Sequence, residues 1–408
     1  MIALFKSSKG LAALFLIACA TKENDNCCRG SDPSPTSYPT TDSTHLATDS
    51  GSLPTNAGYI ETLNTEVTFL WSGVQPIAVT ADDRGLVYPI NATDNLVVVT
   101  ADGSEPLRFV PVMSVCYDPD RLSTTSPTSD ATILRSGEVA LVQPDSSCIH
   151  AVDPITGDVR PIAGGNRGFG GDGGPALEAL FNVPCGVAEG DDGALYVADQ
   201  HNYVVREVRD EQINTVVGTP GVEGFAGDGG LANQALLGGL TIDFATHSNR
   251  VAIDGRRLFI ADACNQVIRV VDLDSGVIDR YAGRVGALSD HECVWGLGTF
   301  EGGYSGDGGA ALSAELNFPV DIAVCKGIAY ITDQANHCIR RVGADGIIST
   351  VAGRCGERGY AGDGGPATEA LLSFPNGADC APNGDLYIAD ASNSAIRRVI
   401  QPELAREE

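Results

Sequence analysis

Four glycine-rich stretches each carry one aspartate, a residue type that could hold a cation or stand in a phosphate loop. They read GFGGDGGPA, GFAGDGGLA, GYSGDGGAA and GYAGDGGPA, and their aspartates are Asp172, Asp228, Asp307 and Asp363. A phosphate cradle needs backbone N–H groups and usually a Lys followed by Ser or Thr, whereas a carboxylate repels the ligand. An EF-hand calcium loop needs oxygen ligands at alternate positions, where these stretches carry mostly Gly and Ala. Neither chemistry fits the pattern.

An aromatic residue stands three positions before each of these aspartates: Phe169, Phe225, Tyr304 and Tyr360. The four aspartates and four aromatics could form a surface for cations or sugars, because aromatic faces stack on both. Each aromatic could also fill the gap between neighbouring repeats, and each aspartate could fix its own loop by accepting backbone N–H bonds. We favour the packing role and keep the binding role open.

A second motif follows each loop: an Asp, an Asn three residues later and an Arg seven residues later. The four sets are Asp199, Asn202 and Arg206; Asp262, Asn265 and Arg269; Asp333, Asn336 and Arg340; Asp390, Asn393 and Arg397. The arginine is expected to pair with a carboxylate of its own or a neighbouring repeat. The motif is therefore interpreted as structural.

These motifs need strands to position them. The apolar run before each Asp and the β-branched run after each Asn predict a β-hairpin with a tight Asx-type turn. A third strand runs into the next glycine-rich loop, and a fourth follows that loop. Four-stranded units repeated in this way predict an all-β fold, the β-propeller.

Residues 161–400 resemble NHL repeats, in the variant with GDGG loops that also occurs in the NHL domain of teneurins. The resemblance rests on the hairpin motif and the glycine-rich loop, which occur together four times. It implies a propeller whose blades carry few family-wide catalytic residues, so it predicts fold better than activity.

Two degenerate blades precede the four clear ones, which predicts a six-bladed propeller over residues 65–402. The first has Asn91, Asp94 and Val98 at the motif positions, and the second has Gln143, Ser146 and His150. The last blade lacks a fourth strand, because only the polar residues 401–408 remain. Residues 66–72, EVTFLWS, are expected to close the ring as an N-terminal strand and to remove an open sheet edge.

The N-terminus predicts export. Residues 1–18 combine two lysines with a short apolar run, which is typical of a secretory signal peptide. The residues before Cys19 resemble a bacterial lipobox, which implies lipidation of Cys19 and, with Ala20 after it, location at the outer membrane or cell surface. Residues 19–58 are rich in Ser, Thr, Pro and Asp and predict a disordered tether.

Composition restricts the partners. The net charge of −27 argues against nucleic acid or an anionic membrane surface, so the lipid anchor is the expected membrane contact. The 12 cysteines of an exported chain predict disulfide bonds, of unknown connectivity, rather than a zinc site. We expect a monomer with no cofactor, although calcium stays open.

The function favoured by the sequence is binding of a protein, peptide or glycan, with no catalysis. The glycine-rich loops and the hairpin turns should share one face of the ring, and long insertions there include Trp295. The alternative is a metal-dependent hydrolase or lyase, similar to propeller lactonases or amidating lyases, with a metal in the central channel. Acidic residues on inner strands keep this alternative open: Asp243, Asp254, Asp321 and Asp379.

Overall fold

The computed structural model describes residues 58–63, 76–82, 86–91, 95–100, 108–111, 128–239, 249–285 and 302–400. All of them belong to one compact unit that spans Thr55–Glu408. Cys19, the expected tether and Trp295 lie outside the described residues. Within these ranges, no helix has both the length and the apolar character that crossing a bilayer requires.

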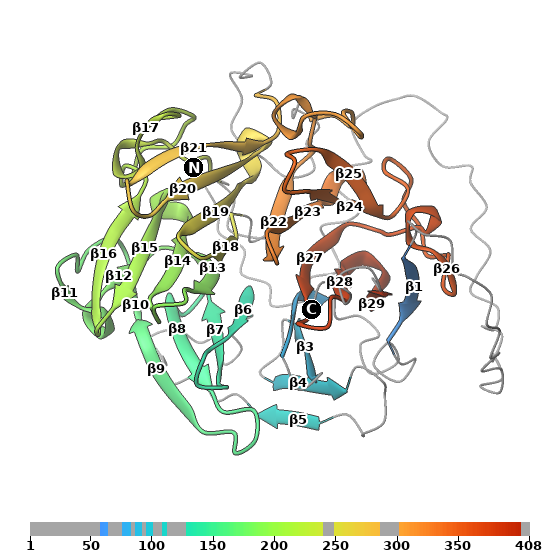
Figure 1. Cartoon of the computed structure of the whole chain (residues 1–408). Coiled ribbons are helices and arrows are strands. Elements are labelled where there is room, and N and C mark those ends of the chain that lie inside the picture. Colours follow the sequence, from blue (N-terminus) through green and yellow to red (C-terminus); the bar gives the residue numbers. More distant parts are fainter. Residues whose placement is uncertain are drawn as a thin grey trace, which may run out of the picture. The chain divides into compact units, whose positions relative to one another are not determined.

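The repeats fold into antiparallel sheets, each named here after its innermost strand (Figure 1). Five sheets are complete blades. From the innermost strand outward they are β6 (Asp130–Ile133), β7 (Val139–Gln143), β8 (Cys148–Val152) and β9 (Val159–Gly164); β13 (Pro184–Glu189), β14 (Leu195–Asp199), β15 (Val204–Arg209) and β16 (Gln212–Val217); β18 (Val251–Asp254), β19 (Arg257–Asp262), β20 (Val267–Asp272) and β21 (Val277–Ala282); β22 (Pro319–Cys325), β23 (Ile328–Asp333), β24 (Cys338–Val342) and β25 (Ile348–Ala352); and β27 (Pro375–Cys380), β28 (Leu386–Asp390), β29 (Ala395–Ile400) and β1 (Tyr59–Thr62).

The fold is therefore an all-β propeller, with five blades established rather than the expected six. A further sheet contains β2 (Pro76–Ala81), β3 (Leu86–Asn91), β4 (Asn95–Thr100) and β5 (Arg108–Pro111). Its strands β3 and β4 are joined by only two residue pairs, and most of its side chains lie outside the described part. Strand β2 packs against both β6 and β27, so this sheet lies between the first and the last complete blade.

An N-terminal strand closes the last blade, as expected, but the assigned segment was wrong. Strand β1 pairs antiparallel with β29, from Tyr59 opposite Ile400 to Thr62 opposite Arg397. The predicted segment, residues 66–72, lies outside the described residues. Ile60 is completely buried in the apolar core next to β29, which gives this short strand its anchor.

The glycine-rich loops join neighbouring blades. Each contains a 3-10 turn: η2 (Ala176–Glu178), η4 (Ala232–Gln234), η6 (Ala311–Ser313) and η8 (Ala367–Glu369). These turns pack on the outer strand of the preceding blade, namely β9, β16, β21 and β25. Three of the loops also add two residues to the outer edge of their own blade: β11 (Gly174–Pro175), β17 (Gly230–Leu231) and β26 (Gly365–Pro366). The first loop in addition forms a small parallel pair, β10 (Asn166–Arg167) with β12 (Leu180–Phe181).

The predicted hairpins are present, but the Asx-type turn was wrong. Each hairpin turns through a 3-10 segment: η3 (Gln200–Asn202), η5 (Ala263–Asn265), η7 (Gln334–Asn336) and η9 (Ala391–Asn393). The aspartate before each segment makes no capping bond to it. A left-handed residue ends each turn, for example His337 with φ 59°. The aspartate side chains are thereby left to bond elsewhere.

Apolar cores lie between adjacent blades rather than inside one. Tyr330 and Ile339 of blade β22, for example, share a core with Leu386 and Ile388 of blade β27. Two disulfides reinforce this region, Cys325–Cys380 between the two innermost strands and Cys338–Cys355 between β24 and the loop that follows β25. Cys148 and Cys264 are also disulfide-bonded, whereas Cys185 is a buried thiol.

Candidate functional site

The two sequence motifs meet in one cluster, which recurs in four blades. The motif arginine, fully buried, lies between the loop aspartate and the hairpin aspartate. Its distances to the two carboxylates are 2.6 and 3.5 Å for Arg206 (Asp172, Asp199), 2.6 and 3.7 Å for Arg269 (Asp228, Asp262), 2.6 and 3.5 Å for Arg340 (Asp307, Asp333), and 2.8 and 3.2 Å for Arg397 (Asp363, Asp390). We call each set an arginine clamp.

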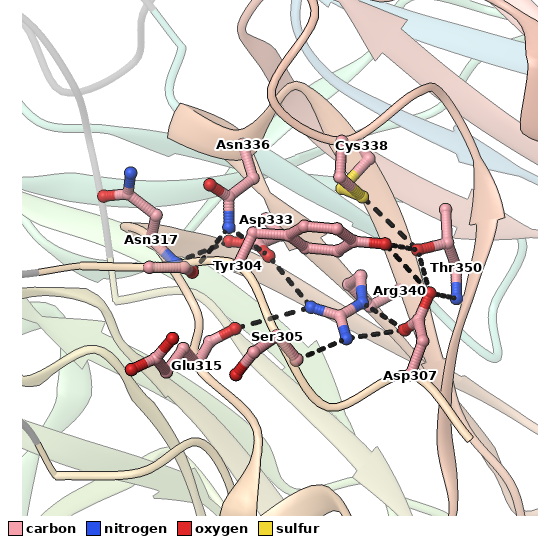
Figure 2. Close-up of polar contacts among 12 residues, drawn as sticks. Tyr304, Ser305, Asp307, Glu315, Asn317, Asp333, Asn336, Cys338, Arg340 and Thr350 are labelled. Atoms are coloured by element: carbon pink, nitrogen blue, oxygen red, sulfur yellow. Dashed lines mark hydrogen bonds and ion pairs between the residues drawn. A yellow bond between two sulfur atoms is a disulfide. The ribbon is translucent and has the colours of Figure 1, made fainter. Parts of the chain in front are cut away.

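Figure 2 shows the clamp of blade β22 in detail. Asp333 accepts hydrogen bonds from the backbone N–H of Asn317 at 2.7 Å and from Nδ2 of Asn336 at 2.8 Å. The same Asn336 amide donates to the carbonyl of Gly303 at 2.9 Å, so it joins the hairpin turn to the glycine-rich loop. Arg340 also donates to the Ser305 carbonyl at 3.1 Å. The clamp therefore holds the glycine-rich loop through two of its backbone carbonyls.

In two of the clamps, a threonine on the outer strand donates a further hydrogen bond from its hydroxyl to the loop aspartate. Thr350 donates to Asp307 Oδ2 at 2.7 Å, and Thr62 of β1 donates to Asp363 Oδ2 at 2.8 Å. Residues 61–63 (Glu-Thr-Leu) thus repeat the role of residues 349–351 (Ser-Thr-Val). This likeness was the sequence signal that could have located the closing strand at β1.

The motif aromatics stack on the clamp arginines. The guanidinium carbon lies 5.0 Å from the ring centre of Phe169, 4.8 Å from Phe225, 4.9 Å from Tyr304 and 5.0 Å from Tyr360. Three of these rings stay about half exposed, at 41% for Phe169, 44% for Tyr304 and 49% for Tyr360. Cation–π contacts hold the rings in place while leaving surface for a partner.

Burial and hydrogen bonding act oppositely on the clamp carboxylates. Burial raises the pKa of Asp199 to about 7 and those of Asp262, Asp333 and Asp390 to about 6, against the lowering effect of their asparagine and arginine partners. Burial also acts to raise the pKa of Asp307, but hydrogen bonds from Thr350 and the charge of Arg340 outweigh it, so this pKa is lowered.

The central channel contains an arginine that the sequence reasoning missed. Arg250, fully buried, donates to the backbone carbonyls of Asn376 at 2.5 Å, Ile77 at 2.8 Å and Ser129 at 2.8 Å. These acceptors belong to β27, to β2 and to the residue before β6. One side chain therefore ties innermost strands from distant parts of the chain.

Strand register explains how Arg250 fits. Six residues take equivalent positions at the innermost strands. Each lies opposite, or in the case of Arg250 is hydrogen-bonded to, the second-strand residue that precedes the first position of the hairpin motif. They are Ala78, Asp130, Gly186, Arg250, Asp321 and Gly377. A Cβ at Gly377 would lie 2.6 Å from Nη1 of Arg250, and one at Gly186 would lie 2.8 Å from its Cα. The two glycines make room for the arginine. The sequence signal that could have revealed this arrangement was a comparison of this one position in the innermost strands of all the repeats.

The channel acids flank this arginine. Asp130 and Asp321 lie 3.7 and 3.6 Å from the guanidinium of Arg250. Burial raises the pKa of Asp130 to about 7, and it also raises the pKa of Asp321, while Arg250 opposes both shifts. Asp379, whose pKa burial raises to about 6, accepts a hydrogen bond from Thr80 at 2.8 Å.

The other acids singled out from the sequence lie apart. Asp254 pairs with Arg257 at the end of β18, and Asp243 lies outside the described residues. Among the residues with a described position, no three His, Cys, Asp or Glu side chains are grouped to hold a metal ion. Both ring nitrogens of the degenerate-blade residue His150 are buried and have no hydrogen-bond partner among the described residues, and burial lowers the pKa of this histidine to about 4.

Known proteins share both the sequence pattern and the fold. No family model matches the chain. A segment of 227 residues, 51% of the chain, is 30% identical to teneurin-m of Drosophila melanogaster, and 247 residues are 29% identical to mouse teneurin-3. The chain is similar to these teneurins over about half of its length. The match spans only 8% of either teneurin, so it concerns one segment of much longer proteins.

Solved structures are similar in fold. A protein of unknown function from Bacteroides thetaiotaomicron has a TM-score of 0.55 at 14% identity, covering 85% of this chain and 72% of its own. An auxiliary nutrient binding protein of the same organism has a TM-score of 0.54 at 13% identity, covering 85% of this chain and 76% of its own. At these identities the likeness concerns the fold alone.

Proposed function

We propose that the chain is a binding or scaffold propeller that recognises a protein, peptide or glycan through the face bearing its glycine-rich loops. The observation that carries this proposal is the set of half-exposed aromatic rings fixed on buried arginines in three blades. Rigid aromatic side chains supply contact area at little cost in conformational entropy, and they are enriched among residues that dominate binding energy. The insertion with Trp295 remains part of this proposed face.

The similar proteins support binding as the broad function. Among the solved structures of similar fold is one called an auxiliary nutrient binding protein, and the similar curated proteins include teneurins. A metal-dependent hydrolase or lyase has less support, because the guanidinium of Arg250 lies between the channel acids Asp130 and Asp321. Metal analysis of the purified protein tests that alternative.

The test is capture of partners from the native cell envelope, together with binding to a glycan array. The full chain should retain a ligand that the double variant Tyr304→Ala/Tyr360→Ala loses, by roughly thirtyfold if the rings contribute about 2 kcal/mol. Ile155→Ala, which changes an exposed side chain in the turn between β8 and β9, outside the glycine-rich loops, is the control. Equal retention by the double variant would refute the assignment of the face.

Three further features are proposals of the same kind. We infer that Cys19 is lipidated and anchors a monomer at the outer membrane or cell surface, and that the sheet β2–β5 serves as a sixth blade. The packing of β2 against both β6 and β27 supports the sixth blade. Replacement of Cys19 by Ala should release the chain from the membrane fraction, and an unchanged membrane pool would refute the anchor.

A further inference from the structure

The seam between blades β6 and β13 contains a cavity of about 640 Å³. Part of its wall is aliphatic: Leu134 and Ile162 come from blade β6, Leu195 and Val208 from blade β13, and Leu177 from the glycine-rich loop between them. Leu177 is 56% exposed, so the wall continues to the surface. A volume of this size lies within the range of sites for small ligands.

The next seam, between blades β13 and β18, is filled by side chains of blade β18. Ile253 and Leu273 pack against the apolar core that the two blades share. Arg256 reaches across the seam, with Nη1 3.0 Å from Asp192 and Nε 2.9 Å from Asp274. Two aliphatic groups and one guanidinium thus occupy the positions that line the cavity in the preceding seam.

Strand register identifies what stands at these positions in blade β13. Ile253 lies opposite Leu258 as Glu189 lies opposite Leu195, and Val271 lies opposite Leu258 as Val208 lies opposite Leu195. Glu189 is thus the equivalent of Ile253, and counting on from Val208 and Val271 makes Asp210 the equivalent of Leu273. Counting back from Leu195 and Leu258 makes Gly193 the equivalent of Arg256, in a turn that is one residue longer in blade β13. All three line the cavity. The cavity therefore exists because two aliphatic residues and an arginine are replaced by two acids and a glycine.

The charge of the cavity follows from the same replacements. Glu189, one of whose oxygens accepts the N–H of Arg135 at 2.6 Å, and the exposed Asp210 contribute carboxylates, and the exposed Glu211 adds a third. Arg160, the basic residue of this lining, is held by Glu138 through two hydrogen bonds of 2.8 and 2.6 Å. The lining thus combines an aliphatic wall with an excess of negative charge.

We propose that this seam binds a peptide segment that presents an arginine beside an aliphatic residue. Such a segment would supply what Arg256, Ile253 and Leu273 supply in the next seam: one guanidinium for the carboxylates and aliphatic bulk for the walls. Carboxylates accept guanidinium groups through paired hydrogen bonds, which favours arginine over a point charge. Residues 173–177 of a glycine-rich loop line this site, but none of the motif aromatics does, so the proposal does not depend on the aromatic rings.

Calorimetry on the full chain tests the proposal with two matched probes, acetyl-Leu-Arg-Ile-amide and acetyl-Leu-Glu-Ile-amide. The arginine peptide should bind at least tenfold more tightly than the glutamate peptide, and its affinity should fall as salt is added, because exposed charge pairs are screened. Absence of binding, or equal binding of both peptides, would overturn the proposal, and so would preference for the glutamate peptide.

Three variants locate the site. Glu189→Ile restores the filler found at Ile253 and should weaken binding at least tenfold, whereas Glu211→Gln should weaken it about two- to fivefold, as for an exposed charge pair. Asp274→Asn removes the equivalent acid in the filled seam and should leave binding unchanged. Melting temperatures measured on each variant separate loss of binding from loss of fold. A folded Glu189→Ile that still binds, or an Asp274→Asn that behaves as Glu211→Gln, would place the peptide elsewhere.

Discussion

Replacement of Arg250 by Met removes a side chain that joins β2, β27 and the start of β6 in the channel. The variant loses three hydrogen bonds to backbone carbonyls and the ion pairs with Asp130 and Asp321. Methionine fills similar volume without donors, so both carboxylates lose their cation and three carbonyls lose a partner. The propeller should remain folded but become much less stable.

The size of the expected loss of stability follows from the carboxylates that remain buried without their cation. Removing one partner of a buried ion pair commonly costs about 3–5 kcal/mol, because the remaining charge is uncompensated. Burial already raises the pKa of Asp130 to about 7, and loss of Arg250 removes the main effect that lowers it. A carboxyl whose folded-state pKa is raised stabilises the fold at low pH, and this stabilisation is lost as pH rises through that pKa. We therefore expect a loss of about 3–5 kcal/mol at pH 8 and a smaller loss at pH 5.

Urea unfolding followed by circular dichroism at both pH values measures these losses. Arg160→Met is the control, because its ion pair with Glu138 is solvent-exposed and should contribute at most about 1 kcal/mol at either pH. A loss below 1 kcal/mol for Arg250→Met at both pH values, or a larger loss at pH 5 than at pH 8, would refute the reasoning.

Three other perturbations address the ring. Ile60→Ala should destabilise the chain by about 2–5 kcal/mol in urea unfolding, because the side chain is completely buried where β1 closes the last blade. Replacing Cys325 and Cys380 by Ala should cost about 4 kcal/mol, the loop-closure term for a cross-link of 55 residues, measured by the same unfolding. We expect the natural chain to lose stability as pH falls below about 6.5, the ordinary histidine pKa, because Nδ1 of His337 accepts the N–H of Phe374 at 3.2 Å and must be unprotonated to do so. His337→Gln should remove this loss, which is measured as the dependence of melting temperature on pH.

Another blade carries a glutamine at the position that His337 occupies. Burial, with a smaller effect of Arg358, lowers the pKa of His337, so the unfolded chain takes up the proton at a higher pH than the folded one. Gln266 occupies the same position in blade β18 and accepts the N–H of Phe318 at 2.5 Å without titrating. A His337→Gln variant whose melting temperature falls with acid as steeply as that of the natural chain would contradict this account. For Ile60, Ile155→Ala is the matched control, since Ile155 is 61% exposed.

Local pattern was enough to predict the hairpins, the glycine-rich loops and the need for a closing strand. Each rests on residues close in sequence, such as the Asp, Asn and Arg of one hairpin. The closing strand was misplaced because residues 66–72 are more apolar than β1, whereas an outer strand needs only one buried residue, here Ile60. The better signal was its threonine, which repeats the contact that Thr350 makes.

The channel could not be predicted in the same way. Arg250 is placed by carbonyls more than 100 residues away in sequence, and its space is provided by glycines on two other strands. No local periodicity reports such a contact. Only the alignment of all innermost strands, position by position, brings one arginine, two aspartates and two glycines to the same level.

The arginine clamps show why the sequence alone did not decide whether the repeated residues serve the fold or the binding of a partner. The inner carboxylate of a clamp is fully buried and bonded to the backbone, so it serves the fold. The aromatic ring of the same clamp rests on the arginine and remains half exposed, so it can serve a partner. Repetition fixes the first role in every blade, whereas specificity must come from what differs between blades. The aromatic rings differ between blades only as Phe or Tyr, whereas the seam fillers differ in size and charge, and we expect partners to bind at both.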